Sequence, residues 1–111
     1  MKAMTLNTAN VVNTAVVCMK HDMDVATSMS KGIMAEVLQK RMMNGEVVRF
    51  VYEKKDGSIR RAIGSLQSDA VKANTVGTGV PKRYYGMFVY LDLEKMAWRG
   101  CKIEKLIGII D

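Results

Sequence analysis

The sequence predicts an α+β fold, in which two N-terminal helices pack on a five-stranded β-barrel of the SH3-like or Sm-like type. Up to residue 45, apolar residues recur at helical spacing, and from residue 46 the apolar pattern has a period of two. Five short strand candidates, a long loop after the second and one helical turn before the last are typical of such a barrel. We therefore expect a helical N-terminal extension over 1–45 and a barrel over 46–111.

The first expected helix covers about 8–21. Val12, Ala15, Val16 and Met19 fit one helical stripe. The β-branched pairs of this segment also suit a strand, so a strand over 8–21 remains an alternative.

The second expected helix covers 29–43, where apolar residues form one face. Ser28 or Ser30 is expected to cap its start. Asn44-Gly45 is expected to end it, because glycine adopts the left-handed conformation that closes many helices.

A β-hairpin is expected next. Val48, Phe50 and Tyr52 alternate with polar or outward positions, and a second strand runs from about 58 to 66. Asp56-Gly57 lies between them, at the positions of a hairpin turn that need positive φ.

The rest of the chain is expected to complete the barrel. Residues 67–83 are polar and glycine-rich and hold the one proline, which predicts a long surface loop of the kind that often carries function. Strands are expected near 84–91, 96–103 and 107–110, with one helical turn at 104–106.

Composition limits the function classes. The net charge of +6 is a modest bias toward anionic partners, and most of the surplus lies after residue 45. Cys18 and Cys101 do not make a disulfide framework, which favours a reducing, cytoplasmic compartment. No apolar run approaches the ~20 residues of a membrane span, so we expect no membrane partner.

Six stretches carry a resemblance to a known family: Val48–Tyr52, Lys54–Arg60, Ala62–Leu66, Tyr90–Lys95, Ala97–Lys102 and Lys105–Ile107. Through them, residues 46–111 resemble the WYL-like, Sm-like SH3 β-barrel proteins, small proteins of gut Bacteroidales and their phages. The resemblance implies a barrel fold and a location inside a bacterial or phage-infected cell. For the larger WYL group it also implies binding of nucleic acid or nucleotide-like ligands, in transcription regulation or phage defence.

The expected binding residues are basic side chains with an aromatic among them: Arg49, Arg60, Arg61, Lys82, Arg83, Tyr85 and Arg99. Arginine suits phosphate because its planar fork donates two parallel hydrogen bonds, and tyrosine can stack on bases. Nucleic acid or a nucleotide is therefore the expected partner. Solvated strand faces with the aromatics in the core remain the alternative.

Trp98 and Arg99 are neighbours on one expected strand, so their side chains point to opposite faces. We therefore expect that both cannot belong to one pocket wall. Trp98 is expected to pack against the loop or the helices, and Arg99 either to pair with Asp92 or Glu94 or to reach a ligand.

No catalytic, metal-binding or cofactor-binding pattern is expected. Cys18 and His21 are three residues apart, but structural zinc usually needs four ligands with paired spacing. The chain has one histidine and no nucleotide-binding loop of a known type. The expected function is therefore non-catalytic.

Methionines open a second hypothesis. Six lie in the helical half: Met19, Met23, Met29, Met34, Met42 and Met43. They either fill the core or form an adaptable face that binds a protein partner or a second copy. The alternative function is thus a homo-oligomer, a virion component or an inhibitor of a host protein.

Overall fold

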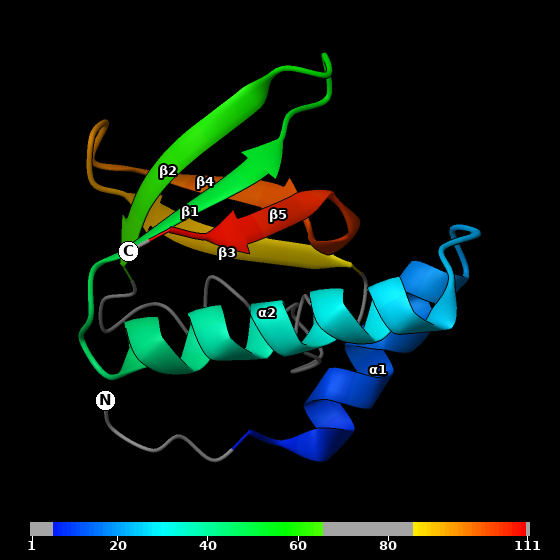
Figure 1. Cartoon of the computed structure of the whole chain (residues 1–111). Helices are drawn as coiled ribbons and strands as arrows, with labels where there is room; N and C mark the ends of the chain where they lie inside the picture. Colours follow the sequence, from blue (N-terminus) through cyan, green and yellow to red (C-terminus); the bar gives the residue numbers. More distant parts are fainter. Residues whose placement is uncertain (1–5, 66–85, 111) are drawn as a thin grey trace.

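The computed structural model describes residues 6–65 and 86–110. Two helices precede a five-stranded antiparallel sheet, which confirms the expected α+β class (Figure 1). The elements are α1 (Thr8–Met19), α2 (Val25–Met43), β1 (Val48–Glu53), β2 (Ile59–Ser65), β3 (Met87–Asp92), β4 (Ala97–Lys102), the 3₁₀ turn η2 (Ile103–Lys105) and β5 (Leu106–Ile109). The segment over 8–19 is thus a helix, and the expected loop over 67–83 lies outside the described residues.

The strand order explains why the sheet curls. The strands follow one another as β4-β3-β2-β1-β5, so β4 and β5 lie at opposite ends of the sheet. The three residues of η2 nevertheless join these two end strands directly. Such a short link requires the sheet to bend until its ends approach, and a register shift in the β1–β5 pairing at Val51/Tyr52 adds to the bend.

The interior of the curled sheet is aromatic. Phe50 is fully buried, and its ring centroid lies 4.9 Å from that of Tyr90 in an edge-to-face arrangement. Phe88 and Tyr52 also contact Phe50 through their rings. The period-two pattern of the sequence is therefore the pattern of inward and outward faces.

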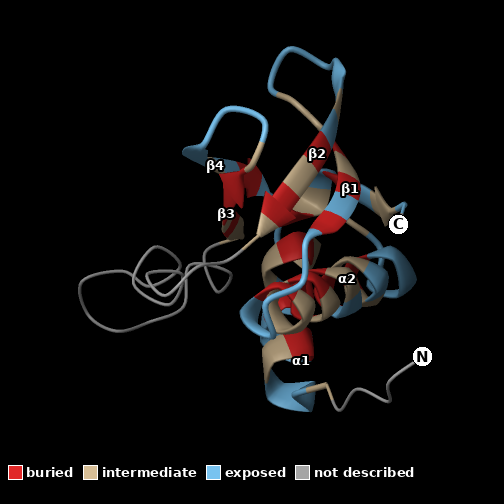
Figure 2. Cartoon of the chain, turned by 90° about the vertical axis from the view of Figure 1, so that its left-hand side faces the viewer, coloured by how far each residue is buried: buried red, intermediate tan, exposed pale blue. Residues whose placement is uncertain are grey.

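The helices cover one side of this interior. Leu38 and Met42 of α2 are fully buried in the same cluster as Phe50. Figure 1 shows α2 across the strands and α1 against α2, and Figure 2 shows the exposed β1–β2 and β3–β4 connections away from the helices. The helical and barrel parts of the chain therefore share one core.

The two helices cross at a glycine. A Cβ built on Gly32 would lie 2.5 Å from the carbonyl oxygen of Val11, closer than real Cβ atoms come to any neighbour. Only glycine fits this crossing without a shift of the backbone.

The cap of α2 differs from expectation. The helix begins at Val25, and the Asp24 side chain accepts a hydrogen bond from the Thr27 backbone N–H at 3.1 Å. Ser28 is buried inside the first turn, so the predicted serine cap is wrong. The predicted helix began too late because residues 25–28 are too weakly apolar to extend the apolar face of 29–43. Gly45 has φ +87° and ends the helix as expected.

The hairpin turn also differs in detail. Gly57 has φ +86°, as the turn requires, but Asp56 is not among the residues with positive φ. Asp56 instead accepts hydrogen bonds from the backbone N–H and the hydroxyl of Ser58, at 2.9 and 2.6 Å. The turn is therefore longer than the predicted two-residue loop, and it extends from Lys54 to Ser58.

Within the described ranges 6–65 and 86–110, neither helix has the length and apolarity that a membrane crossing needs.

Candidate functional site

An open groove of about 720 Å³ follows strand β4. All the residues that line it in the described part of the chain come from the barrel. Six of them are basic and one, Glu53, is acidic; the basic ones are Lys54, Lys55, Arg60, Arg99, Lys102 and Lys105. The groove therefore gathers much of the positive charge of the barrel in one place.

Strand alternation divides the predicted arginines. Arg60 pairs with the buried Tyr52 across β1 and β2, so it lies on the inner face, and it lines the groove. Its neighbour Arg61 pairs with Val51 on the outer face. Arg49 is also exposed on the outer face, opposite Ile63. The structure thus brings Arg60 and Arg99 together but not Arg49 and Arg61.

The other three predicted residues lie outside the described ranges: Lys82, Arg83 and Tyr85.

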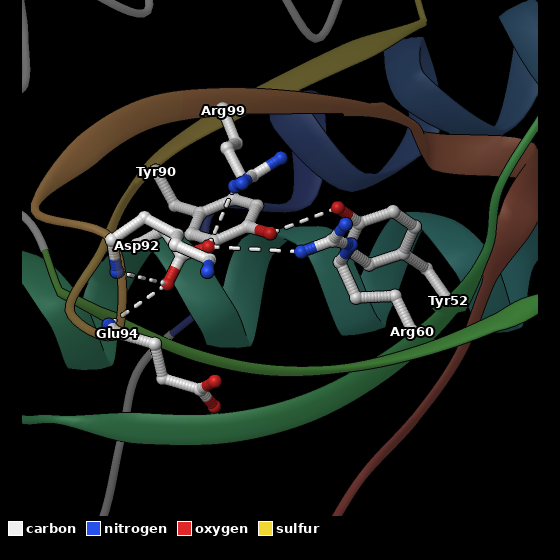
Figure 3. Close-up of polar contacts among 7 residues, drawn as sticks. Tyr52, Arg60, Tyr90, Asp92, Glu94 and Arg99 are labelled. Atoms are coloured by element: carbon white, nitrogen blue, oxygen red, sulfur yellow. Dashed lines mark hydrogen bonds and ion pairs between the residues drawn. The ribbon is translucent and has the colours of Figure 1, made fainter.

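Asp92 is buried beside the two arginines that line the groove (Figure 3). Its Oδ2 lies 2.6 Å from Arg99 Nε and 3.8 Å from Arg60 Nη1. Its Oδ1 accepts a hydrogen bond from the Glu94 backbone N–H at 2.9 Å and thereby closes the β3–β4 turn. Of the two expected carboxylate partners of Arg99, the structure selects Asp92.

The Asp92 carboxyl remains charged in this environment. Burial acts to raise its pKa, but hydrogen bonds from the backbone N–H groups of Glu94 and Lys95, together with the Arg99 guanidinium, act in the opposite direction. The hydrogen bonds and the guanidinium prevail, so the pKa of Asp92 lies below its usual range.

A pH prediction follows for Asp92→Asn. A carboxyl with a lowered pKa in the folded state stabilises the fold above its unfolded pKa of about 3.9, and this contribution is lost as pH falls through the folded pKa. The difference in unfolding free energy between wild type and Asp92→Asn should therefore be largest near neutral pH and shrink under acid. Urea unfolding at several pH values measures this difference in free energy. A difference that does not change with pH would contradict the stabilising role of the charged Asp92 carboxyl.

Two tyrosine hydroxyls lie beside the arginines. The hydroxyl oxygens of Tyr52 and Tyr90 are 2.8 Å apart, and both residues are buried. Burial and the hydrogen bond to Tyr52 raise the pKa of Tyr90 far above its usual value. Burial likewise raises the pKa of the Cys101 thiol to about 12, so this groove residue stays protonated and unreactive at neutral pH.

Trp98 lines the same groove as Arg99, so the expectation that both cannot belong to one pocket wall is wrong. Trp98 pairs with Leu91 on the outer face and leaves 42% of its surface exposed. The reason is that β4 ends the sheet, so a groove along its edge contacts side chains from both faces of the strand. The expected packing of Trp98 against the loop falls on residues outside the described ranges.

Cys18 and His21 border a smaller cavity of about 160 Å³ between α1 and the end of β4. His21 Nδ1 lies 3.9 Å from Glu104 Oε2. Burial raises the pKa of the Cys18 thiol. Among the described residues, no three His, Cys, Asp or Glu side chains gather as they would around a metal ion.

Several groove residues were not among the seven expected binding residues. Trp98 and Lys102 lie on the strand of Arg99, and Lys54 and Lys55 lie at the hairpin end. The sequence offers Trp98, Lys54 and Lys55 as stacking or basic candidates, but nothing in it points to Lys102. Their charge and aromatic character were visible, but their common location depends on β4 being an edge strand.

Comparisons with known proteins agree with this architecture. The family described as WYL_2, Sm-like SH3 beta-barrel fold, matches residues 35–107. The match begins within α2, earlier than the expected start at residue 46. A protein of Enterobacteria phage T4, described as an uncharacterized 11.5 kDa protein in the Gp31-cd intergenic region, is 33% identical over 86 residues, which cover 75% of this chain and 83% of that protein.

No solved structure matches the chain. The family match covers more than half of the chain, and the phage relative is aligned over most of its own length. The resemblance found in the sequence is thus confirmed, and the chain belongs to the WYL_2 family, with its Sm-like SH3 β-barrel fold.

Proposed function

We propose that this phage-related protein is a non-catalytic binding module that takes single-stranded nucleic acid into the groove along β4. The observation that carries the proposal is the combination of six basic side chains, one acidic side chain and an exposed indole in one groove. A regulatory or accessory role and a bacterial, Bacteroidales-type host remain predictions from the resemblance.

The charge of the groove is only partly neutralised. Glu53 pairs with Lys105 at 3.6 Å, and Asp92 lies between the two arginines. Among the described residues, no acidic side chain pairs with Lys54, Lys55 or Lys102. These lysines are therefore available to replace the counterions of a phosphate backbone.

Trp98 supports a preference for single strands. Stacking of a base on an aromatic side chain contributes about 1–3 kcal/mol, and it requires an accessible face of the base. The faces of paired bases are covered by their neighbours in a duplex. An unpaired base can reach the exposed indole of Trp98, whereas a duplex offers only its phosphates.

The test is a binding titration with labelled single-stranded and duplex oligonucleotides at two salt concentrations. Trp98 is the one tryptophan of the chain, so its fluorescence reports stacking directly. We expect the single strand to bind more tightly, to quench Trp98 and to lose affinity steeply with salt, with a log–log slope of about −0.7 per phosphate contacted. Absence of binding at about 50 mM salt, where such contacts are strong, would remove the proposal.

Trp98→Ala should weaken single-strand binding by about 10-fold, because it removes one stacking platform. The salt slope should not change, since no phosphate contact is lost. Trp98→Phe is the matched control, because it keeps a flat ring and should retain most of the affinity. Anisotropy titrations measure both variants, and wild-type affinity for Trp98→Ala would contradict stacking.

The methionines support core filling rather than the alternative partner surface. Met42 is fully buried, and Met23 and Met34 pack against the core cluster. Among the six methionines from Met19 to Met43, all of which the structure describes, Met43 alone is exposed. The methionines therefore give no support to a partner surface on the helices.

A further inference from the structure

We propose that the floor of the groove is a seat for a terminal phosphate, formed by the guanidiniums of Arg60 and Arg99 and the hydroxyl of Tyr52. The protein would then prefer strands that end in a phosphate monoester over strands that do not. This inference rests on the proposed function, since it names the part of the nucleic acid that the groove recognises.

The three donors come from three different strands. Tyr52 of β1 is the register partner of Arg60 on β2, and Arg99 of β4 is the register partner of Tyr90 on β3. Tyr52, Arg60 and Arg99 all line the groove. Figure 3 shows both guanidiniums meeting at Asp92, beside the pair of tyrosine hydroxyls. The donors therefore converge on the inner face of the curled sheet and not along its outer surface.

The tyrosine pair leaves one proton unused. Two hydroxyls carry two protons, and their mutual bond of 2.8 Å uses one of them. Tyr90 is fully buried and does not line the groove, whereas Tyr52 lines it. Without a ligand, either hydroxyl can donate this bond. A phosphate in the groove would accept the proton of Tyr52, and Tyr90 would then donate the bond between the two hydroxyls.

The two arginines are held unequally. Arg99 Nε is buried in an ion pair 2.6 Å from Asp92 Oδ2 that lacks hydrogen-bond geometry, whereas Arg60 Nη1 lies 3.8 Å from the same oxygen. Arg99 therefore offers its two terminal nitrogens from a fixed position. Arg60 can turn its whole fork toward a phosphate without breaking a hydrogen bond to Asp92.

The charge of the seat suits a monoester. Asp92 Oδ2 offsets one of the two guanidinium charges, and Lys54 and Lys102 add positive charge along the groove. A terminal phosphate carries a charge of about −1.5 to −2 and three strong acceptor oxygens, whereas an internal phosphodiester carries one charge and two free oxygens. Three converging donors therefore match the terminal group better.

The experiment compares one single-stranded sequence with a 5′-phosphate, with a 3′-phosphate and with neither. We expect at least one phosphorylated form to bind about 10-fold more tightly, which is the effect of charge-assisted hydrogen bonds to one added group. A mononucleotide monophosphate should compete better than its nucleoside. Equal binding of all three strands would overturn the seat and leave the proposed function intact, whereas no binding of any strand would overturn both.

Two variants locate the seat. Tyr52→Phe keeps the buried ring and removes one hydroxyl, so the preference for the phosphorylated end should fall several-fold. Arg60→Gln should lose the preference, and Arg61→Gln, which removes the same charge from the outer face of the same strand, should keep it. Thermal unfolding of each variant checks the fold. Full preference in both Tyr52→Phe and Arg60→Gln would contradict the seat.

Discussion

Phe50→Ala should lower the free energy of unfolding by about 4 kcal/mol, because removal of a buried phenyl ring costs the transfer of the ring and leaves a cavity. Phe50 has 0% exposure and lies against the rings of Tyr52, Phe88 and Tyr90. The loss would affect helices and sheet together, because Leu38 and Met42 belong to the same core cluster. Urea unfolding followed by circular dichroism measures the effect.

A loss of this size is comparable to the whole stability of many small domains, which is about 5–15 kcal/mol. Phe50→Leu therefore accompanies the test, because it keeps most of the apolar volume and should cost less than half as much. Ile59→Ala is the control on the neighbouring strand, since Ile59 is 56% exposed and should change stability little. Equal losses for Phe50→Ala and Ile59→Ala would contradict the assignment of Phe50 to the centre of the core.

The local patterns of the sequence predicted most elements of the fold. Alternation placed Phe50 and Tyr52 on one face, and the structure buries both. Gly45 and Gly57 adopt the positive φ that their positions required. The cap at Asp24 was missed because the apolar stripe, which begins later, was taken as the start of the helix.

The candidate site was harder to predict because it depends on strand order. Alternation could separate Arg60 from Arg61, which lie on opposite faces of β2. It could not bring Trp98 and Arg99 into one groove, because that requires β4 to be the end of the sheet. Whether a strand is central or at an edge follows from pairings between residues distant in sequence, and no local pattern reports it.

Charge reversal tests whether position or total charge governs binding. Lys54→Glu with Lys102→Glu alters two residues of the groove, and Arg49→Glu with Arg61→Glu alters two exposed residues of the outer face. Both double variants change the net charge of the protein by the same amount. The groove variant should bind a single-stranded oligonucleotide roughly 100-fold more weakly, because two phosphate contacts become like-charge repulsions.

The outer-face variant should lose much less affinity at physiological salt. The Debye length there is about 8 Å, so exposed charges farther than this from the bound strand are largely screened. Anisotropy titrations at two salt concentrations, with thermal unfolding to verify the fold, separate the two variants. Equal weakening would mean that the net charge of +6 attracts nucleic acid over the whole surface, and the groove would then not be the binding site. Because both pairs exchange two basic residues for two glutamates, and only Lys54 and Lys102 line the groove, a large difference between the variants would locate the bound strand at the groove.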